Sequence, residues 1–192
     1  MCAKDNPRFA DYAGIRVDSQ RTGSEDWKDL AEYEIYVMAV RGNGPPAAHL
    51  ESLDKWKSQY PQSDYAGTRL KIYLLTYQQL NNHRAAFDTA AEILKTDPND
   101  LQSLEEIVDR GLQLVPGQPN SRLSAENKSD LDTIQKSGRY ILENLDQIWS
   151  ADKKPGPVSD EQWRLAKNTM RQSAQTVVDR ALALTQDVPK QP

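Results

Sequence analysis

WKSQYP, at residues 56–61, and ILKTDP, at residues 93–98, are two similar stretches that divide the chain into comparable units. Each closes an apolar segment with a proline, and Pro61 and Pro98 are 37 residues apart. Polar residues that can cap a helix follow each proline, and another helical segment begins after them. A helix-hairpin unit that recurs at such an interval is typical of an α-solenoid, in which no unit buries its apolar face alone.

Apolar residues outside these stretches recur at three- and four-residue intervals, which is the period of one helical face. Pairs such as Asn81 and Asn82 turn the chain between helical segments, and Ser159 with Gln162 has the spacing of a capping box. No segment alternates as a strand does, so the sequence predicts an all-α fold. The seven predicted helices cover about 25–41, 46–60, 66–80, 83–96, 101–115, 124–150 and 160–186.

This pattern predicts four parts along the chain. Residues 1–24 mix polar residues, proline and glycine without a period and are expected to be loosely ordered. Residues 25–116 carry the helical repeats, and 117–186 carry a degenerate repeat whose long helices cap the solenoid. A solenoid end exposes apolar surface unless it is capped, so these helices either cap it within one chain or pair with a second copy as a homodimer. Residues 187–192 form a polar tail.

Composition narrows the class of partner. The chain of 192 residues has a formal charge of −4 and contains no block of Lys or Arg. Binding to the phosphates of a nucleic acid, independent of its sequence, requires such a block. Nucleic acid is therefore not an expected ligand. The longest apolar run is far shorter than the roughly 18 residues of a membrane span. The first residues, MCAKDNPRF, show no apolar leader, so no signal peptide is expected in this chain.

The single cysteine, Cys2, excludes a disulfide within the chain. Mature bacterial lipoproteins begin with a lipid-modified cysteine, so Cys2 is a candidate for lipid attachment. The alternative is an incidental thiol near a chain end, and the sequence favours that alternative.

The unit that ends at Pro98 resembles the tetratricopeptide repeat (TPR) family. Tyr77, Ala86 and Pro98 match the family pattern, and Leu70 and Tyr73 are apolar substitutes for its usual residues. The unit departs from the pattern at Leu74, where the family has glycine, and at Ala90, where it has an aromatic residue. The unit that ends at Pro61 fits more loosely. The resemblance covers about residues 26–116.

Residues 60–77, YPQSDYAGTRLKIYLLTY, resemble the longer-period repeats of bacterial envelope proteins and of multi-repeat bacterial proteins. The envelope proteins include the outer-membrane assembly lipoprotein and the periplasmic coordinator of the Tol system. This resemblance implies a bacterial protein and leaves the cytoplasm and the periplasm both open.

The TPR resemblance implies that the first helix of each hairpin lines a concave groove that binds a protein or peptide. The residues it assigns to the groove are Glu34, Met38, Arg41, Thr68, Lys71, Leu75, Gln78, Gln79, Gln102, Glu105 and Asp109. They form a mixed floor of apolar contacts, amides and charges of both signs. Glu34 and Met38 stand where chaperone-binding members carry Lys and Asn, so a C-terminal carboxylate is not the expected ligand. The alternative is a solvated face without a ligand.

Groups for catalysis are sparse in this sequence. His49 and His83 are the only histidines, and neither has a metal ligand at the usual spacing, so no metal or cofactor is expected. Adjacent carboxylates such as Glu105 and Glu106 diverge by about 100° around a helix. The sequence therefore predicts a non-enzymatic interaction or scaffold module. The alternatives are a structural or lipid-anchored envelope assembly module and, less favoured, an unrecognised enzyme on a helical scaffold.

Overall fold

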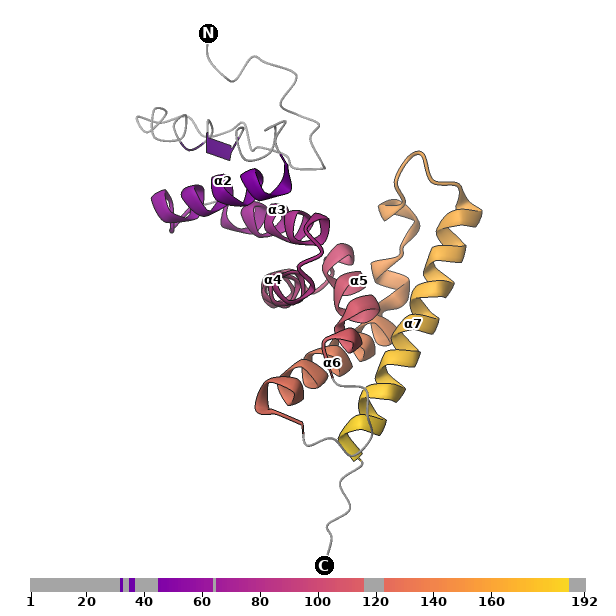
Figure 1. Cartoon of the computed structure of the whole chain (residues 1–192). Helices are drawn as coiled ribbons and strands as arrows, with labels where there is room; N and C mark the ends of the chain where they lie inside the picture. The colour runs from indigo at the N-terminus through magenta and orange to yellow at the C-terminus, as the bar shows by residue number, and fades with distance from the viewer. Residues whose placement is uncertain (1–31, 33–34, 37–44, 64, 116–122, 187–192) are drawn as a thin grey trace, which may run out of the picture. The chain divides into compact units, whose positions relative to one another are not determined.

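The computed structural model describes residues 32, 35–36, 45–63, 65–115 and 123–186, and every ordered element in these ranges is a helix (Figure 1). The helices are α2 (Pro46–Gln59), α3 (Ala66–Gln79), α4 (His83–Thr96), α5 (Leu101–Arg110), α6 (Ala125–Ile148) and α7 (Asp160–Gln186). Two short 3-10 helices, η3 (Gly111–Gln113) and η4 (Ala151–Lys153), follow α5 and α6. The all-α prediction is thus confirmed for the described part of the chain. The predicted segments 1–24 and 187–192, most of the predicted helix 25–41, and residues 116–122 lie outside it.

The chain divides into two compact units, Met1–Leu80 and Asn81–Pro192. The division falls between α3 and α4, which the sequence pairs as the clearest hairpin. The pairing of α3 with α4 and the solenoid as a whole therefore stay predictions.

In the first unit, α2 packs against α3 through an apolar cluster. Leu53 and Trp56 of α2 and Ile72 and Tyr73 of α3 are buried in it. The partly buried residues around this cluster are Ile35, Tyr36, Leu50, Tyr60, Tyr65 and Tyr77. The ring of Tyr36 meets that of Trp56 edge to face, with centroids 5.6 Å apart. Trp56 is therefore a packing anchor, as the helical spacing predicts.

Polar groups close the edge of this cluster. The buried carboxylate of Glu32 accepts a hydrogen bond of 2.7 Å from the indole Nε1 of Trp56 and a second one from the hydroxyl of Ser63. Arg69 lies with its guanidinium 5.4 Å from the centre of the Trp56 ring and donates to the carbonyl of Tyr60 at 2.9 Å. The buried charges of Glu32 and Arg69 are thus compensated by directed contacts, as burial requires.

In the second unit, α4 packs on α5, and α6 and α7 run side by side as a long antiparallel pair (Figure 1). The helix α5 contacts both α6 and α7 and so joins the two pairs. The buried side chains from these helices include Phe87, Ile93, Leu104, Ile107, Leu131, Ile134, Ile141 and Ala174. The helices of this unit therefore share one apolar core.

Two glycines allow close approach in this core. A Cβ on Gly138 of α6 would lie 2.7 Å from a methyl of Val178 and 3.2 Å from the carbonyl oxygen of Ala174. A Cβ on Gly111 would lie 2.7 Å from the side chain of Ile134 and 3.0 Å from the ring of Phe87. Both positions lack room for any larger residue unless neighbours shift.

Helix starts follow the local signals in the sequence. Asn82, Asp100 and Ser124 each accept a hydrogen bond from a backbone N–H in the first turn of α4, α5 and α6. Ser159 and Gln162 form the predicted capping box, with reciprocal bonds of 2.9 and 3.1 Å. Asn81 has φ of 53°, a left-handed conformation that asparagine tolerates better than most residues, and this explains the turn before α4.

Candidate binding faces on α3 and α5

The predicted groove residues fall into three sets. Glu34, Met38 and Arg41 lie outside the described residues, as does Cys2. Thr68, Lys71, Leu75, Gln78 and Gln79 lie on α3 of the first unit. Gln102, Glu105 and Asp109 lie on α5 of the second unit. The two described sets belong to different units, so a groove that joins them stays a prediction.

The α3 face consists of Thr68, Lys71, Leu75, Gln78 and Gln79, which recur at three- and four-residue intervals and form one stripe. Leu75 is 40 % exposed, whereas its neighbours Ile72 and Leu74 are buried. Lys71 and Gln78 are half-buried. The face thus presents an apolar side chain between polar ones.

Two tyrosines of α3 support the first unit beside this face. Tyr73 stacks on Tyr77 with ring centroids 5.7 Å apart, and its hydroxyl donates to Asp54 of α2 at 2.7 Å. Burial raises the pKa of both phenols above the ordinary value, and the negative charge of Asp54 raises it further. Both tyrosines are therefore neutral at physiological pH and serve as hydrogen-bonding and packing groups.

The α5 face consists of Gln102, Glu105 and Asp109. Glu105 and Asp109 are one helical turn apart, exposed, and on the same side of the helix. Partial loss of hydration raises the pKa of the Glu105 carboxyl above 4.5, and the charge of Asp109 raises it further. Desolvation also raises the pKa of Asp109, while a hydrogen bond from Ser173 of α7 and the charge of Arg110 oppose that shift. The face is thus a negatively charged surface beside α7.

Adjacent carboxylates on α5 behave as the helical geometry predicts. Glu105 is exposed, whereas Glu106 is buried, with an oxygen 3.7 Å from Nε of Arg110. The two carboxylates therefore point in different directions and do not form an acid–base pair.

Sequence reasoning missed the charged cluster around Arg84. This α4 residue forms ion pairs at 2.7 Å with Asp130 of α6 and at 2.6 Å with Asp88 of its own helix. Its guanidinium also lies 5.0 Å from the centre of the Phe87 ring. The pairing with Asp88 is visible in the sequence as a four-residue spacing. The pairing with Asp130 is not, because 46 residues separate the two partners.

Neither a metal site nor a membrane span is found in the part of the chain that the structure describes. The described residues contain no group of three or more His, Cys, Asp or Glu side chains that could hold a metal ion. His83 instead lies with Nδ1 3.3 Å from the guanidinium of Arg110. Among the helices of the described ranges, none is long and apolar enough to cross a membrane.

Comparison with known proteins gives no family for this chain. No family model, no curated protein and no solved structure matches it.

Proposed function

We propose that this chain is a non-enzymatic interaction module that binds a segment of a partner protein on the outward faces of α3 and α5. In this proposal its helices stack as TPR-like hairpins, and the two faces form the floor of one groove. The proposal covers no catalytic step and no cofactor.

The exposure of Leu75 carries the proposal. The side chain is 40 % exposed although Ile72 and Leu74, its neighbours on α3, are taken into the core. A single exposed leucine on a protein surface is ordinary. This one lies at the centre of the stripe that the repeat pattern assigns to the groove, between Lys71 and Gln78, and so it can serve as an apolar anchor with polar groups around it.

The α5 face supports the same role in a different way. Glu105 and Asp109 present two negative charges on one side of the helix and can steer a partner and fix its orientation.

Photo-crosslinking tests the proposal directly. A photoreactive amino acid placed at Gln79, an exposed residue of the α3 face, is expected to capture a defined partner from extracts of the cells that make the protein. The double change Lys71→Glu and Leu75→Glu is expected to abolish that capture and to leave the circular dichroism spectrum unchanged, because both side chains lie outside the buried cluster of the first unit.

The matched control is Leu165 of α7, which is 64 % exposed and lies outside the predicted groove. The photoreactive residue at Leu165 is expected to give no specific adduct, and Leu165→Glu is expected to retain capture. Unchanged capture by the Lys71→Glu, Leu75→Glu protein would refute the binding role of the α3 face.

A further inference from the structure

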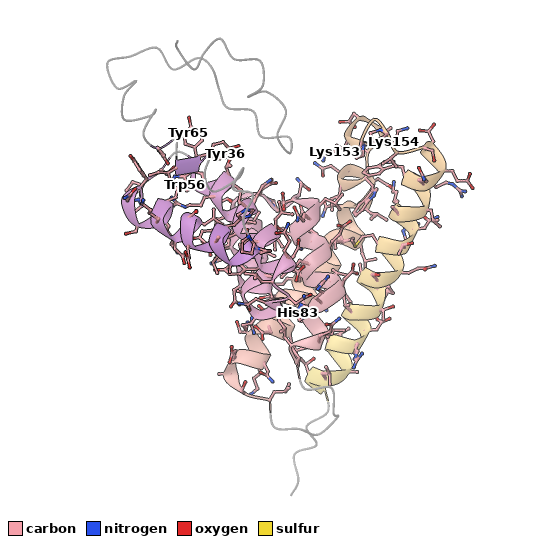
Figure 2. The ribbon with its side chains drawn as sticks, turned by 45° about the horizontal axis from the view of Figure 1, so that its top comes forward. Tyr36, Trp56, Tyr65, His83, Lys153 and Lys154 are labelled. Carbon is pink, nitrogen blue, oxygen red and sulfur yellow. The ribbon has the colours of Figure 1, made fainter. Side chains whose placement is uncertain are left out.

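The end of the α6–α7 pair holds two tryptophans in contact. Trp149 caps the C-terminus of α6, and Trp163 lies in the first turn of α7. Their ring centroids are 5.9 Å apart and their planes are tilted by 38°. Trp149 is only 3 % exposed, and Trp163 is partly buried. Figure 2 shows Lys153 and Lys154 in the loop that joins the two helices here.

Other polar groups at this end have partners within the protein. Lys153 donates to the carbonyl of Gln147 at 3.0 Å, and Lys154 pairs with Asp160. Ser159 and Gln162 satisfy each other through the capping box. The loop is therefore a well-bonded turn and not a loose connection.

The two indole N–H groups differ from these neighbours. The Nε1 atoms of Trp149 and Trp163 are shielded from solvent, and neither forms a hydrogen bond with any of the described residues. In the first unit of the same chain, the buried indole of Trp56 donates to Glu32 at 2.7 Å. A buried indole N–H usually has a partner, and leaving one unmade is costly.

We propose that Trp149 and Trp163 form a buried binding site for one uncharged hydrogen-bond acceptor, and that its occupant is an internal water molecule. The two indole rings are neighbours, so in this proposal one oxygen accepts from both nitrogens, at about 2.9 Å from each. Internal waters characteristically join buried polar groups that protein atoms leave unbonded.

The surrounding charges favour a neutral occupant over an anion. Lys154 is paired with Asp160, and Lys167 is paired with Asp146 at 2.7 Å. Asp160 and Glu161 add negative charge in the first turn of α7, where an anion would otherwise be attracted. The shielding of both indole nitrogens from solvent favours an occupant as small as water over a larger molecule.

Nuclear magnetic resonance of the full chain tests this site. The chain has four tryptophans and hence four indole N–H signals. Trp149 and Trp163 are each replaced in turn by 3-benzothienylalanine, which keeps the shape of the side chain but has sulfur in place of the N–H. Each replacement removes one signal and so assigns it. In the unmodified protein both signals are expected to show a cross-peak to water that tumbles with the protein.

Thermal unfolding of the same variants gives a second, independent result. Loss of either N–H is expected to lower the melting temperature by about 2–4 °C, because a bonded donor is lost without a change of shape. The signal of Trp56, whose N–H is bonded to Glu32, is the control that should show no such cross-peak. Absence of the water cross-peak at both tryptophans, with an unchanged or raised melting temperature, would overturn the proposal. A water cross-peak at only one of the two indole N–H signals would overturn the proposal that both donate to the same water molecule.

Discussion

At the scale of single residues, the pair of Arg84 and Asp130 joins α4 to α6 in the second unit through a partly buried charged contact. Asp130 is 8 % exposed, whereas Arg84 is 35 % exposed. Removal of the arginine leaves a buried carboxylate without its cation, which is costlier than the loss of an exposed ion pair.

We therefore expect Arg84→Met to lower the free energy of unfolding by about 2 kcal/mol. Asp88→Asn removes the exposed partner of the same arginine and is expected to cost less than about 0.5 kcal/mol. Urea denaturation of the two variants provides the comparison. Equal losses of unfolding free energy in the two variants would mean that the buried pair with Asp130 contributes no more than the exposed pair with Asp88.

A second residue-scale prediction concerns Glu105 and Asp109. Their pKa values are raised in the folded chain, so the folded state binds protons more readily than the unfolded state. Their contribution to stability therefore becomes unfavourable as the pH rises above about 4 and is absent well below it. We expect Glu105→Gln to raise the melting temperature at pH 7 and to have no effect at about pH 2.5.

The matched control for this change is Glu143→Gln, at an exposed position of α6. It should alter the melting temperature little at either pH. A gain from Glu105→Gln that is as large in acid as at neutral pH would exclude the electrostatic explanation.

At the scale of elements, the sequence predicts starts of helices better than ends. The starts depend on residues three positions apart, as at Asp100 and Ser159, and such local signals are legible without a structure. The helix predicted over 101–115 instead ends at Arg110 and continues as the 3-10 helix η3. Gly111 lies there against Ile134, and that contact crosses helices distant in sequence.

The contact between α6 and α7 gives the element-scale prediction. Glycine in a helix interior is about 1 kcal/mol less favourable than alanine, so Gly→Ala ordinarily stabilises a helix. At Gly138 we expect the opposite, a loss of roughly 1–3 kcal/mol, because the new methyl would lie 2.7 Å from Val178 and 3.2 Å from a backbone oxygen. Thermal unfolding measures the difference.

Gly67 is the matched control for Gly138, because a Cβ there meets nothing within 4 Å and the residue is also helical. Gly67→Ala should be neutral or stabilising. The change Val178→Ala makes room beside Gly138, so Gly138→Ala should cost less in that background. If Gly138→Ala lowers stability equally in both backgrounds, its contact with Val178 is not the cause of the loss.

At the scale of the whole molecule, the helix content and order could be predicted from the sequence because they follow from a local period. The structure places the candidate groove residues on α3 and α5, and their role in binding stays a prediction. The contacts that fix each unit could not be predicted in this way. The bond from Trp56 to Glu32 joins residues 24 positions apart, and no local pattern indicates it.

One arrangement distinguishes a solenoid from two separate units. The TPR resemblance assigns Leu75 of α3 and Asp109 of α5 to the same position of successive repeats, 34 residues apart. The 37 residues between Pro61 and Pro98 correspond to this 34-residue repeat with three residues, 62–64, inserted. The first helices of neighbouring hairpins would then lie roughly one helix-packing distance apart, about 8–10 Å between axes. A cysteine pair at these two positions, in a Cys2→Ser background, should crosslink efficiently with a bifunctional thiol reagent whose length matches this separation.

The chain suits this experiment because Cys2 is its only cysteine, so one substitution gives a thiol-free background. The control pair joins Leu75 to Lys95, an exposed residue of α4 that the repeat pattern does not assign to the groove, and should crosslink less. Efficient crosslinking of 75 to 109, together with loss of partner capture on changes at either position, would mean that both units contribute to one binding surface. If 75 and 109 fail to crosslink but Leu75→Glu still abolishes capture, the α3 face binds its partner alone, and the groove does not extend into the second unit.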